Sequence, residues 1–146
     1  RAAWSCPYDP DVLLLVLDKD HRTSENISHT KKFVVALPSE DQKKIALDLG
    51  SVHGRDVGNK LLIKDVKTEK SQKFGLDVMS GALAYFECEL QDEMLFEEKG
   101  ICLSKVVNVY VRDDSWDDKE ECFNPGFKRT LHHVTGSTFC SGGELV

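Results

Sequence analysis

The sequence predicts one mainly β domain, an antiparallel barrel or sandwich with helical insertions. Two long segments rich in β-branched and aromatic residues follow each other after Gly81, at residues 82–90 and 101–111. The helix-like segments fall in the earlier half of the chain. A length of 146 residues suits a single core that buries roughly two-thirds of the unfolded surface. These observations disfavour a doubly wound parallel sheet.

The first elements are a turn, a strand and a short helix. Residues 1–10 contain two prolines and are expected to turn into a buried strand at 11–18, an apolar run bounded by turn signals. A polar cluster follows at 18–23. Thr23 or Ser24 is expected to cap a short helix that runs to about Thr30.

A second strand and a capped helix come next. The strand is predicted at 32–37 and ends at Pro38. Ser39 and Gln42 have the spacing of a capping box, and Ile45 and Leu49 fall on one face of the helix that follows. Gly50 is placed to end this helix.

The remaining segments read mostly as connections. Residues 57–66 are expected to form one or two helical turns, and 64–74 an exposed, irregular connection. Asp92 and Glu93 suggest a turn between the two long strands. Residues 113–121 read as a solvated acidic loop around Trp116, and 130–140 as a final hairpin.

The turn-rich segment at 49–60 has the chemistry of a phosphate-binding loop. Glycines let backbone N–H groups approach an anion, Arg55 can pair with two phosphate oxygens, and Lys60 adds a charge. The segment matches neither the Walker pattern nor the dinucleotide fingerprint, so an ordinary surface loop is the alternative. The polar cluster with Lys19 and Arg22 is a second anion-friendly place, with a solvated turn as its alternative.

Composition excludes several classes of protein. A net charge of −6 disfavours a nucleic-acid binder or a protein of anionic membrane surfaces. The longest apolar run, residues 12–17, is too short to span a bilayer. The five cysteines are odd in number and widely spread, which favours reduced thiols and a cytoplasmic location.

No catalytic side chain or metal site is expected from the sequence. It contains no nucleophile elbow, no H-E-x-x-H motif and no paired carboxylates. A zinc site fails on spacing, because His132 and His133 are adjacent and point to opposite faces of a strand.

Three segments carry a resemblance to a known family. Residues 13–38 contain a strand, Lys-x-x-x-Thr, a short helix and Lys-Phe-Val-Val-Ala-Leu-Pro. Residues 51–60 read Ser-Val-His-Gly-Arg-Asp-Val-Gly-Asn-Lys, and residues 82–90 read Ala-Leu-Ala-Tyr-Phe-Glu-Cys-Glu-Leu. In order, spacing and letters this resembles the flavin reductase-like proteins of the flavoredoxin type, over roughly residues 12–111.

The resemblance implies a single FMN-binding split β-barrel domain over residues 1–146, with antiparallel Greek-key strands, and a homodimer with flavin near the subunit interface. The implied function is that of an oxidoreductase, a flavoprotein that passes reducing equivalents from NAD(P)H through FMN to a flavin or another acceptor. Because FMN carries the redox chemistry, such a protein needs no catalytic side chain. The alternative is a non-catalytic FMN-binding protein for electron transfer or storage, or a barrel without flavin.

The resemblance also implies the site residues. Trp4 and Ser5 resemble the end of the segment along the isoalloxazine ring, and His133 and Phe139 match the flavin-side region. The implied phosphate and ribityl contacts are Lys19, His21, Arg22, Thr23, Ser51, Gly54, Arg55, Asp56 and Lys60. The sequence departs from the family pattern at His53, which stands before Gly54, and by an extra residue before Lys60. Family chains usually carry one or two further N-terminal strands, which this sequence does not include.

Overall fold

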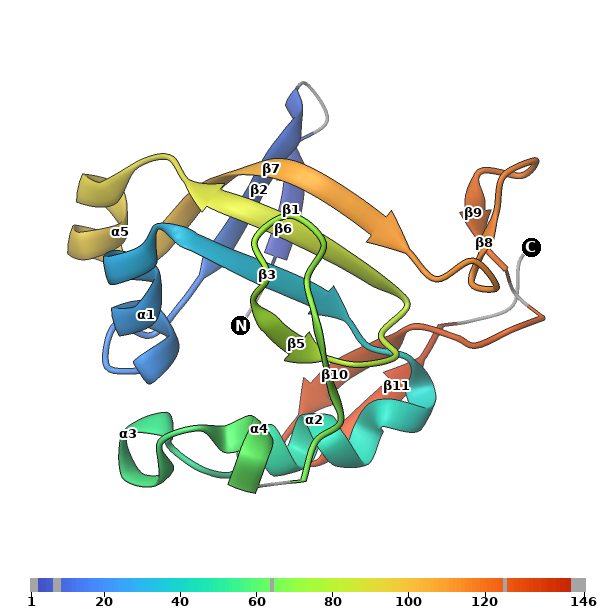
Figure 1. Ribbon diagram of the computed structural model, residues 1–146, viewed down its shortest axis with the longest axis horizontal. Helices are drawn as coiled ribbons and strands as arrows, with labels where there is room; N and C mark the ends of the chain where they lie inside the picture. Colours follow the sequence, from blue (N-terminus) through green and yellow to red (C-terminus); the bar gives the residue numbers. More distant parts are fainter. Residues whose placement is uncertain (1–2, 7–8, 64, 125, 143–146) are drawn as a thin grey trace.

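The computed structural model describes residues 3–6, 9–63, 65–124 and 126–142 (Figure 1). Side chains are described for all of these residues except 3–6, 9–10 and 63. The elements, in chain order, are β1 (Ala3–Cys6), β2 (Asp9–Val16), α1 (Arg22–Thr30), β3 (Lys32–Leu37), the short 3-10 helix η1 (Glu40–Gln42), α2 (Lys43–Gly50), α3 (Gly54–Val57), α4 (Lys60–Ile63), β4 (Thr68–Lys70), β5 (Asp77–Met79), β6 (Ala84–Leu90), α5 (Glu93–Lys99), β7 (Ile101–Val111), β8 (Trp116–Asp117), β9 (Cys122–Phe123), β10 (Leu131–Thr135) and β11 (Thr138–Ser141).

The central feature is a five-stranded antiparallel sheet in the order β1-β2-β7-β6-β3. Three two-stranded ribbons, β4–β5, β8–β9 and β10–β11, accompany it. The prediction of a mainly β fold with helical insertions is therefore confirmed. The strands described close no barrel, so barrel closure stays a prediction.

The long strands lie where the sequence pattern places them. The predicted bounds of β3 and β7 agree with the structure, and β2 and β6 differ from their predictions by about two residues. One core cluster packs α1 and α5 against one end of the five-stranded sheet. Its buried members are Ile27, Phe33, Cys88, Leu90, Phe96 and Cys102. Figure 1 shows α1 and α5 side by side at one end, with α2, α3 and α4 beyond the sheet on another side.

The prediction of a turn at Asp92 and Glu93 was wrong, and so was the confinement of helices to the earlier half. Asp92 instead caps α5, and its carboxylate accepts a hydrogen bond from the backbone N–H of Leu95 at 2.8 Å. Gly100 ends the helix with a φ of +69°. The Gly100 carbonyl also accepts a hydrogen bond from the backbone N–H of Leu17, just after β2, at 2.9 Å.

The expected irregular connection at 64–74 was also wrong in part, because β4 pairs with β5. A buried side chain of the main sheet holds the turn between β4 and β5 in place. The backbone N–H groups of Lys73 and Phe74 donate to the carboxylate of Glu87 in β6, at 2.8 to 3.1 Å. The ribbon is thus fixed by this long-range contact together with the packing of Val78 in β5 against Ala82 and Tyr85.

Helix starts were predicted with mixed success. The capping box of Ser39 and Gln42 is present and is confirmed, and α2 ends at Gly50 as expected. Capping of α1 by Thr23 or Ser24 was wrong, since His21 occupies the cap position. Ser24 lies inside the first turn, where its hydroxyl donates to the Asp18 carbonyl at 2.7 Å.

Further differences lie near the two ends of the chain. Strand β1 precedes the turn predicted within residues 1–10, and the β8–β9 ribbon starts inside the predicted acidic loop and ends just after it, where Trp116 packs edge-on against Phe123. The final hairpin is confirmed as β10–β11.

Within the part of the chain that the structure describes, no helix has the length and apolar character needed to cross a membrane.

Candidate functional site

A cavity of about 940 Å³ lies between α1 and the α3–α4 segment. It is lined by Arg22, Thr23, Glu25, Asn26, Leu49, Gly54, Arg55, Gly58, Asn59, Lys60, Leu61 and Asp77. The lining joins the N-terminal half of α1 to the glycine-rich segment. The two anion-friendly segments of the sequence therefore face one another across one space.

A smaller cavity of about 70 Å³ adjoins the same elements. Arg22, Thr23, Gly54 and Lys60 line both cavities. His21 and His53 also line the small one, and each is the cap residue of its helix, α1 and α3 respectively. Their ring centroids are 5.8 Å apart. The N-terminal ends of α1 and α3 therefore both border this smaller cavity.

Gly54 allows this close approach. It is buried, and a Cβ atom at its position would lie 2.9 Å from Cβ of Arg22, closer than side chains pack. A larger residue would push α3 away from α1. The glycine is needed for packing here, since its φ is not in the left-handed region.

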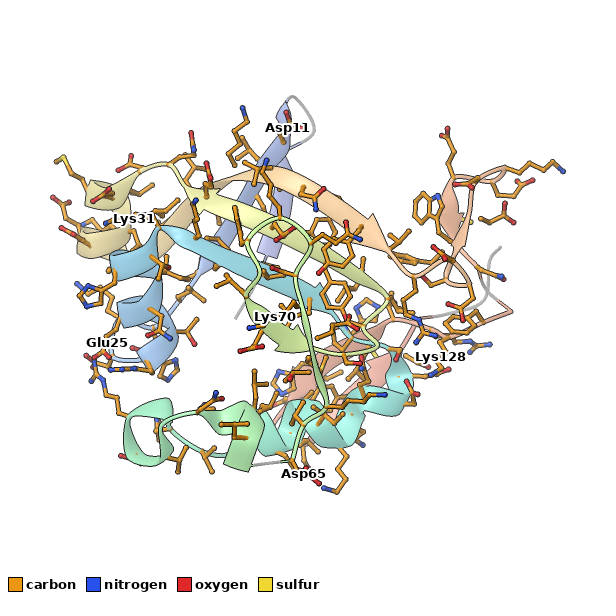
Figure 2. The ribbon with its side chains drawn as sticks, viewed as in Figure 1. Asp11, Glu25, Lys31, Asp65, Lys70 and Lys128 are labelled. Atoms are coloured by element: carbon orange, nitrogen blue, oxygen red, sulfur yellow. The ribbon has the colours of Figure 1, made fainter. Side chains whose placement is uncertain are left out.

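Arg22, Glu25 and Arg55 form a charged triad on the cavity wall. Arg22 Nη1 lies 2.9 Å from Glu25 Oε2, and Arg55 Nη2 pairs with Glu25 Oε1. Hydrogen bonds from Arg22 first, and then from Arg55, hold the pKa of Glu25 below its usual value. Figure 2 shows Glu25 on the side of α1 that faces α3.

Lys60 completes the positive side of the cavity. Its Nζ donates to the Leu49 carbonyl at 3.0 Å, which joins the start of α4 to the end of α2. The side chain is half-buried, and its charge stays beside the two cavities. Three cations, Arg22, Arg55 and Lys60, and two carboxylates, Glu25 and Asp77, line the larger cavity, and the excess of positive charge attracts an anion such as a phosphate monoester.

Six of the residues predicted from the sequence line these cavities, namely His21, Arg22, Thr23, Gly54, Arg55 and Lys60. Lys19 does not line them, because its Nζ donates to the carbonyls of Glu97 and Glu98 at the end of α5, at 2.9 and 3.4 Å. The Ser51 hydroxyl donates to the Asp48 carbonyl at 2.9 Å, and Asp56 is exposed outside the lining.

The other predicted residues lie on the edge strand β1 of the main sheet and on the β10–β11 ribbon. His133 and Phe139 face each other on β10–β11, with ring centroids 4.9 Å apart, and Lys43 Nζ of α2 lies 5.9 Å from the Phe139 centroid. Trp4 and Ser5 have their backbone in β1, and their side chains lie outside the described part. The roles of these residues stay predictions.

The sequence reasoning missed several lining residues. Glu25 carried a usable signal, because it follows Arg22 by three positions and so shares its face of a helix. Leu49, Gly58 and Asn59 lie in the glycine-rich segment at 49–60 that the sequence indicated, although they were not predicted individually, whereas Asn26 and Leu61 have no charge or motif that sets them apart. Asp77 reaches the cavity from β5, a strand that the sequence did not reveal. Among the described residues, no three His, Cys, Asp or Glu side chains are placed to hold a metal ion.

Comparison with known proteins adds a family match. The family model described as "Flavin reductase like domain" matches residues 1–133. The chain is also 30% identical to the protein YddH of Escherichia coli strain K12, described as uncharacterized, over 149 residues that cover 99% of this chain and 78% of that protein.

Two solved structures show the same fold. The FMN-binding domain of a flavin reductase-like enzyme from Shewanella baltica OS155 matches with a TM-score of 0.82 and 25% identity, over 99% of this chain and 77% of the other. Flavoredoxin of Desulfovibrio vulgaris (Miyazaki F) matches with a TM-score of 0.82 and 15% identity, over 99% and 76%. The similarity thus extends along nearly the whole chain.

Proposed function

The chain belongs to the flavin reductase-like domain family, and we propose that it binds FMN and passes reducing equivalents from NAD(P)H through FMN to an acceptor. The proposal rests on the family and on the cavity between α1 and α3. The Shewanella baltica protein with this fold is an FMN-binding domain, which supports FMN as the flavin.

The observation that carries the proposal is the convergence of Arg22, Arg55 and Lys60 on one cavity beside Gly54. FMN ends in a phosphate monoester, whose oxygens accept charge-assisted hydrogen bonds from guanidinium and ammonium groups. A flavin without phosphate has no group that uses these cations. The residues present therefore fit FMN at its phosphate end.

In this proposal the residues of the chain bind and orient the flavin. FMN, when bound, accepts a hydride or electrons and passes them on. Arg22 and Arg55 anchor the phosphate, Lys60 adds charge, and Gly54 keeps α3 close enough to α1 for both arginines to reach one ligand. No side-chain acid or base is required for this role.

We also propose that the protein is a cytoplasmic homodimer whose strands form a split barrel, as the family resemblance implies. Light scattering with FMN present checks the assembly. A mass near twice the 16.4 kDa of the chain is expected, and a monomer at micromolar concentration would contradict the dimer.

The test of the function is the absorption spectrum of the purified protein with FMN, before and after anaerobic addition of NADH or NADPH. Bound FMN is expected to absorb at about 450 nm and to bleach with one of the nicotinamides. A yellow protein that neither nicotinamide bleaches would point instead to an electron carrier or storage protein. A protein that takes up no FMN would sink the proposal.

A further inference from the structure

Glu25 is the one acidic side chain in contact with the arginines of the described cavity wall. Its two oxygens are divided between them, with Oε2 on Arg22 and Oε1 on Arg55. The carboxylate is about one-third exposed, so a ligand in the cavity reaches it. It therefore sits where an anionic ligand would place its own oxygens.

The arginines keep binding capacity beyond this contact. Arg22 uses Nη1 and Arg55 uses Nη2 for Glu25, and within the described residues their remaining nitrogens have no recorded hydrogen bond. Each guanidinium has five N–H donors. A phosphate can therefore join the triad while Glu25 stays, or replace Glu25 on one arginine, and in both cases it meets the negative charge of Glu25.

We propose that Glu25 is a built-in counter-anion that weakens the binding of a phosphate monoester at this site and so favours exchange of FMN. The inference rests on the proposed function. Without ligand, Glu25 keeps Arg22 and Arg55 together across the gap between α1 and α3. With ligand, it repels the phosphate, because like charges at contact distance oppose each other even near the surface.

The proposal distinguishes charge from shape. Glu25→Gln keeps the length of the side chain and one oxygen that accepts a hydrogen bond, removes the charge, and replaces the second oxygen with an NH2 group, which donates. If Glu25 served merely to position the arginines, its loss would weaken phosphate binding. If Glu25 is a competing anion, its loss strengthens the binding of FMN and leaves riboflavin, which lacks the phosphate, unchanged.

The matched control is Glu93→Gln. Glu93 lies in the first turn of α5, is exposed, and pairs with Lys31 at 2.6 Å, outside both cavities at α1 and α3. Glu93→Gln makes the same kind of substitution as Glu25→Gln, breaks the ion pair with Lys31, and changes the net charge of the protein by the same amount. Any effect of total charge on FMN binding therefore appears in both variants.

The experiment measures dissociation constants of FMN and riboflavin by titration calorimetry, for the full chain and the two variants, with thermal unfolding to check the fold. Glu25→Gln is expected to bind FMN about 3- to 10-fold more tightly, and to bind riboflavin like the unaltered protein. Glu93→Gln is expected to change neither constant. Glu25→Ala removes the same charge and is expected to tighten FMN binding as well.

Unchanged or weaker FMN binding by both Glu25 variants would overturn the inference while leaving the proposed function intact. An equal gain for riboflavin, or an equal gain in Glu93→Gln, would also overturn it. If the unaltered protein and all variants bind no FMN, the proposed function itself fails, and the inference fails with it.

Discussion

Two glutamates show how differently the sheet and the cavity use the same side chain. Glu87 lies in β6 and is fully buried. Its oxygens accept hydrogen bonds from the N–H groups of Lys73 and Phe74 and from the amide of Asn108, the last at 2.7 Å. Glu25 is partly exposed and pairs with two arginine side chains that are themselves about half exposed, 58% for Arg22 and 46% for Arg55.

The difference separates a carboxylate that holds the fold together from one that lies on the wall of the proposed binding cavity. Water does not readily replace the hydrogen bonds of Glu87, because the carboxylate is buried and two of its donors are backbone groups. Losing the carboxylate therefore leaves polar groups without a partner. The partners of Glu25 can turn to a ligand or to solvent at little cost. Changes in the sheet should therefore alter stability, and changes at the cavity should alter binding.

The largest contrast is expected in thiol reactivity. Burial raises the pKa of Cys88 to about 12 and that of Cys102 to about 11, and both lie in the sheet core, whereas Cys140 on β11 is exposed. In the native protein, Cys140 should react with a thiol reagent at least about 1000-fold faster than the two core cysteines, which need unfolding to react. Mass spectrometry of time points measures the labelling at each cysteine.

In denaturant without reductant, all five cysteines are expected to react. An internal disulfide in carefully purified protein would contradict the cytoplasmic proposal. Rapid native labelling of Cys88 or Cys102 would mean that the sheet core opens far more easily than its burial suggests.

Glu87→Ala is expected to lower the free energy of unfolding by about 3 kcal/mol, because the N–H groups of Lys73 and Phe74 and the amide of Asn108 lose a buried, charged acceptor. Urea denaturation measures it. The control is Glu89→Gln on the same strand, where the side chain is 40% exposed and lies 3.9 Å from Lys32. That change should stay within about 0.5 kcal/mol. Equal effects at both positions would remove the distinction drawn for Glu87.

Arg55→Ala is expected to weaken FMN binding by about 1.5–3 kcal/mol, the range for a hydrogen bond to a charged group. Riboflavin should bind the variant and the unaltered protein alike, and the free energy of unfolding should change by less than about 0.5 kcal/mol. Calorimetric titration and denaturation check the two parts. Unaltered FMN affinity would place the phosphate away from the α1–α3 cavity.

The smallest expected effect is on the acid dependence of stability. Burial raises the pKa of Glu87, but the hydrogen bonds from Asn108, Phe74 and Lys73 outweigh it, so the pKa lies below its usual value. A lowered pKa in the folded state means that the charged carboxylate stabilises the fold at neutral pH, and that this contribution is lost as the pH falls through and below the usual carboxyl range.

Glu87→Gln removes this titration. The variant should therefore lose less stability than the unaltered protein between about pH 7 and about pH 3, although it starts from a lower value. Denaturation curves at several pH values measure both slopes. Parallel curves would show that Glu87 does not contribute to acid sensitivity.

The sequence by itself determined the elements whose stability is local or patterned. The bounds of β3 and β7 follow from runs of β-branched and aromatic residues, and the Ser39–Gln42 capping box follows from spacing within four residues. The prediction that Arg55 and Gly54 suit a phosphate also came from residue type alone, and the structure places both beside one cavity.

Only the tertiary structure decided which charges meet. Lys19 and Arg22 belong to one polar cluster in the sequence, yet Lys19 turns to the end of α5 and Arg22 to Glu25. The helix α5 and the ribbon β4–β5 were not evident, because the first depends on a cap and on packing of Phe96, and the second on Glu87. Contacts between residues far apart in the chain leave no local pattern, since their energy exists only after the sheet has brought them together.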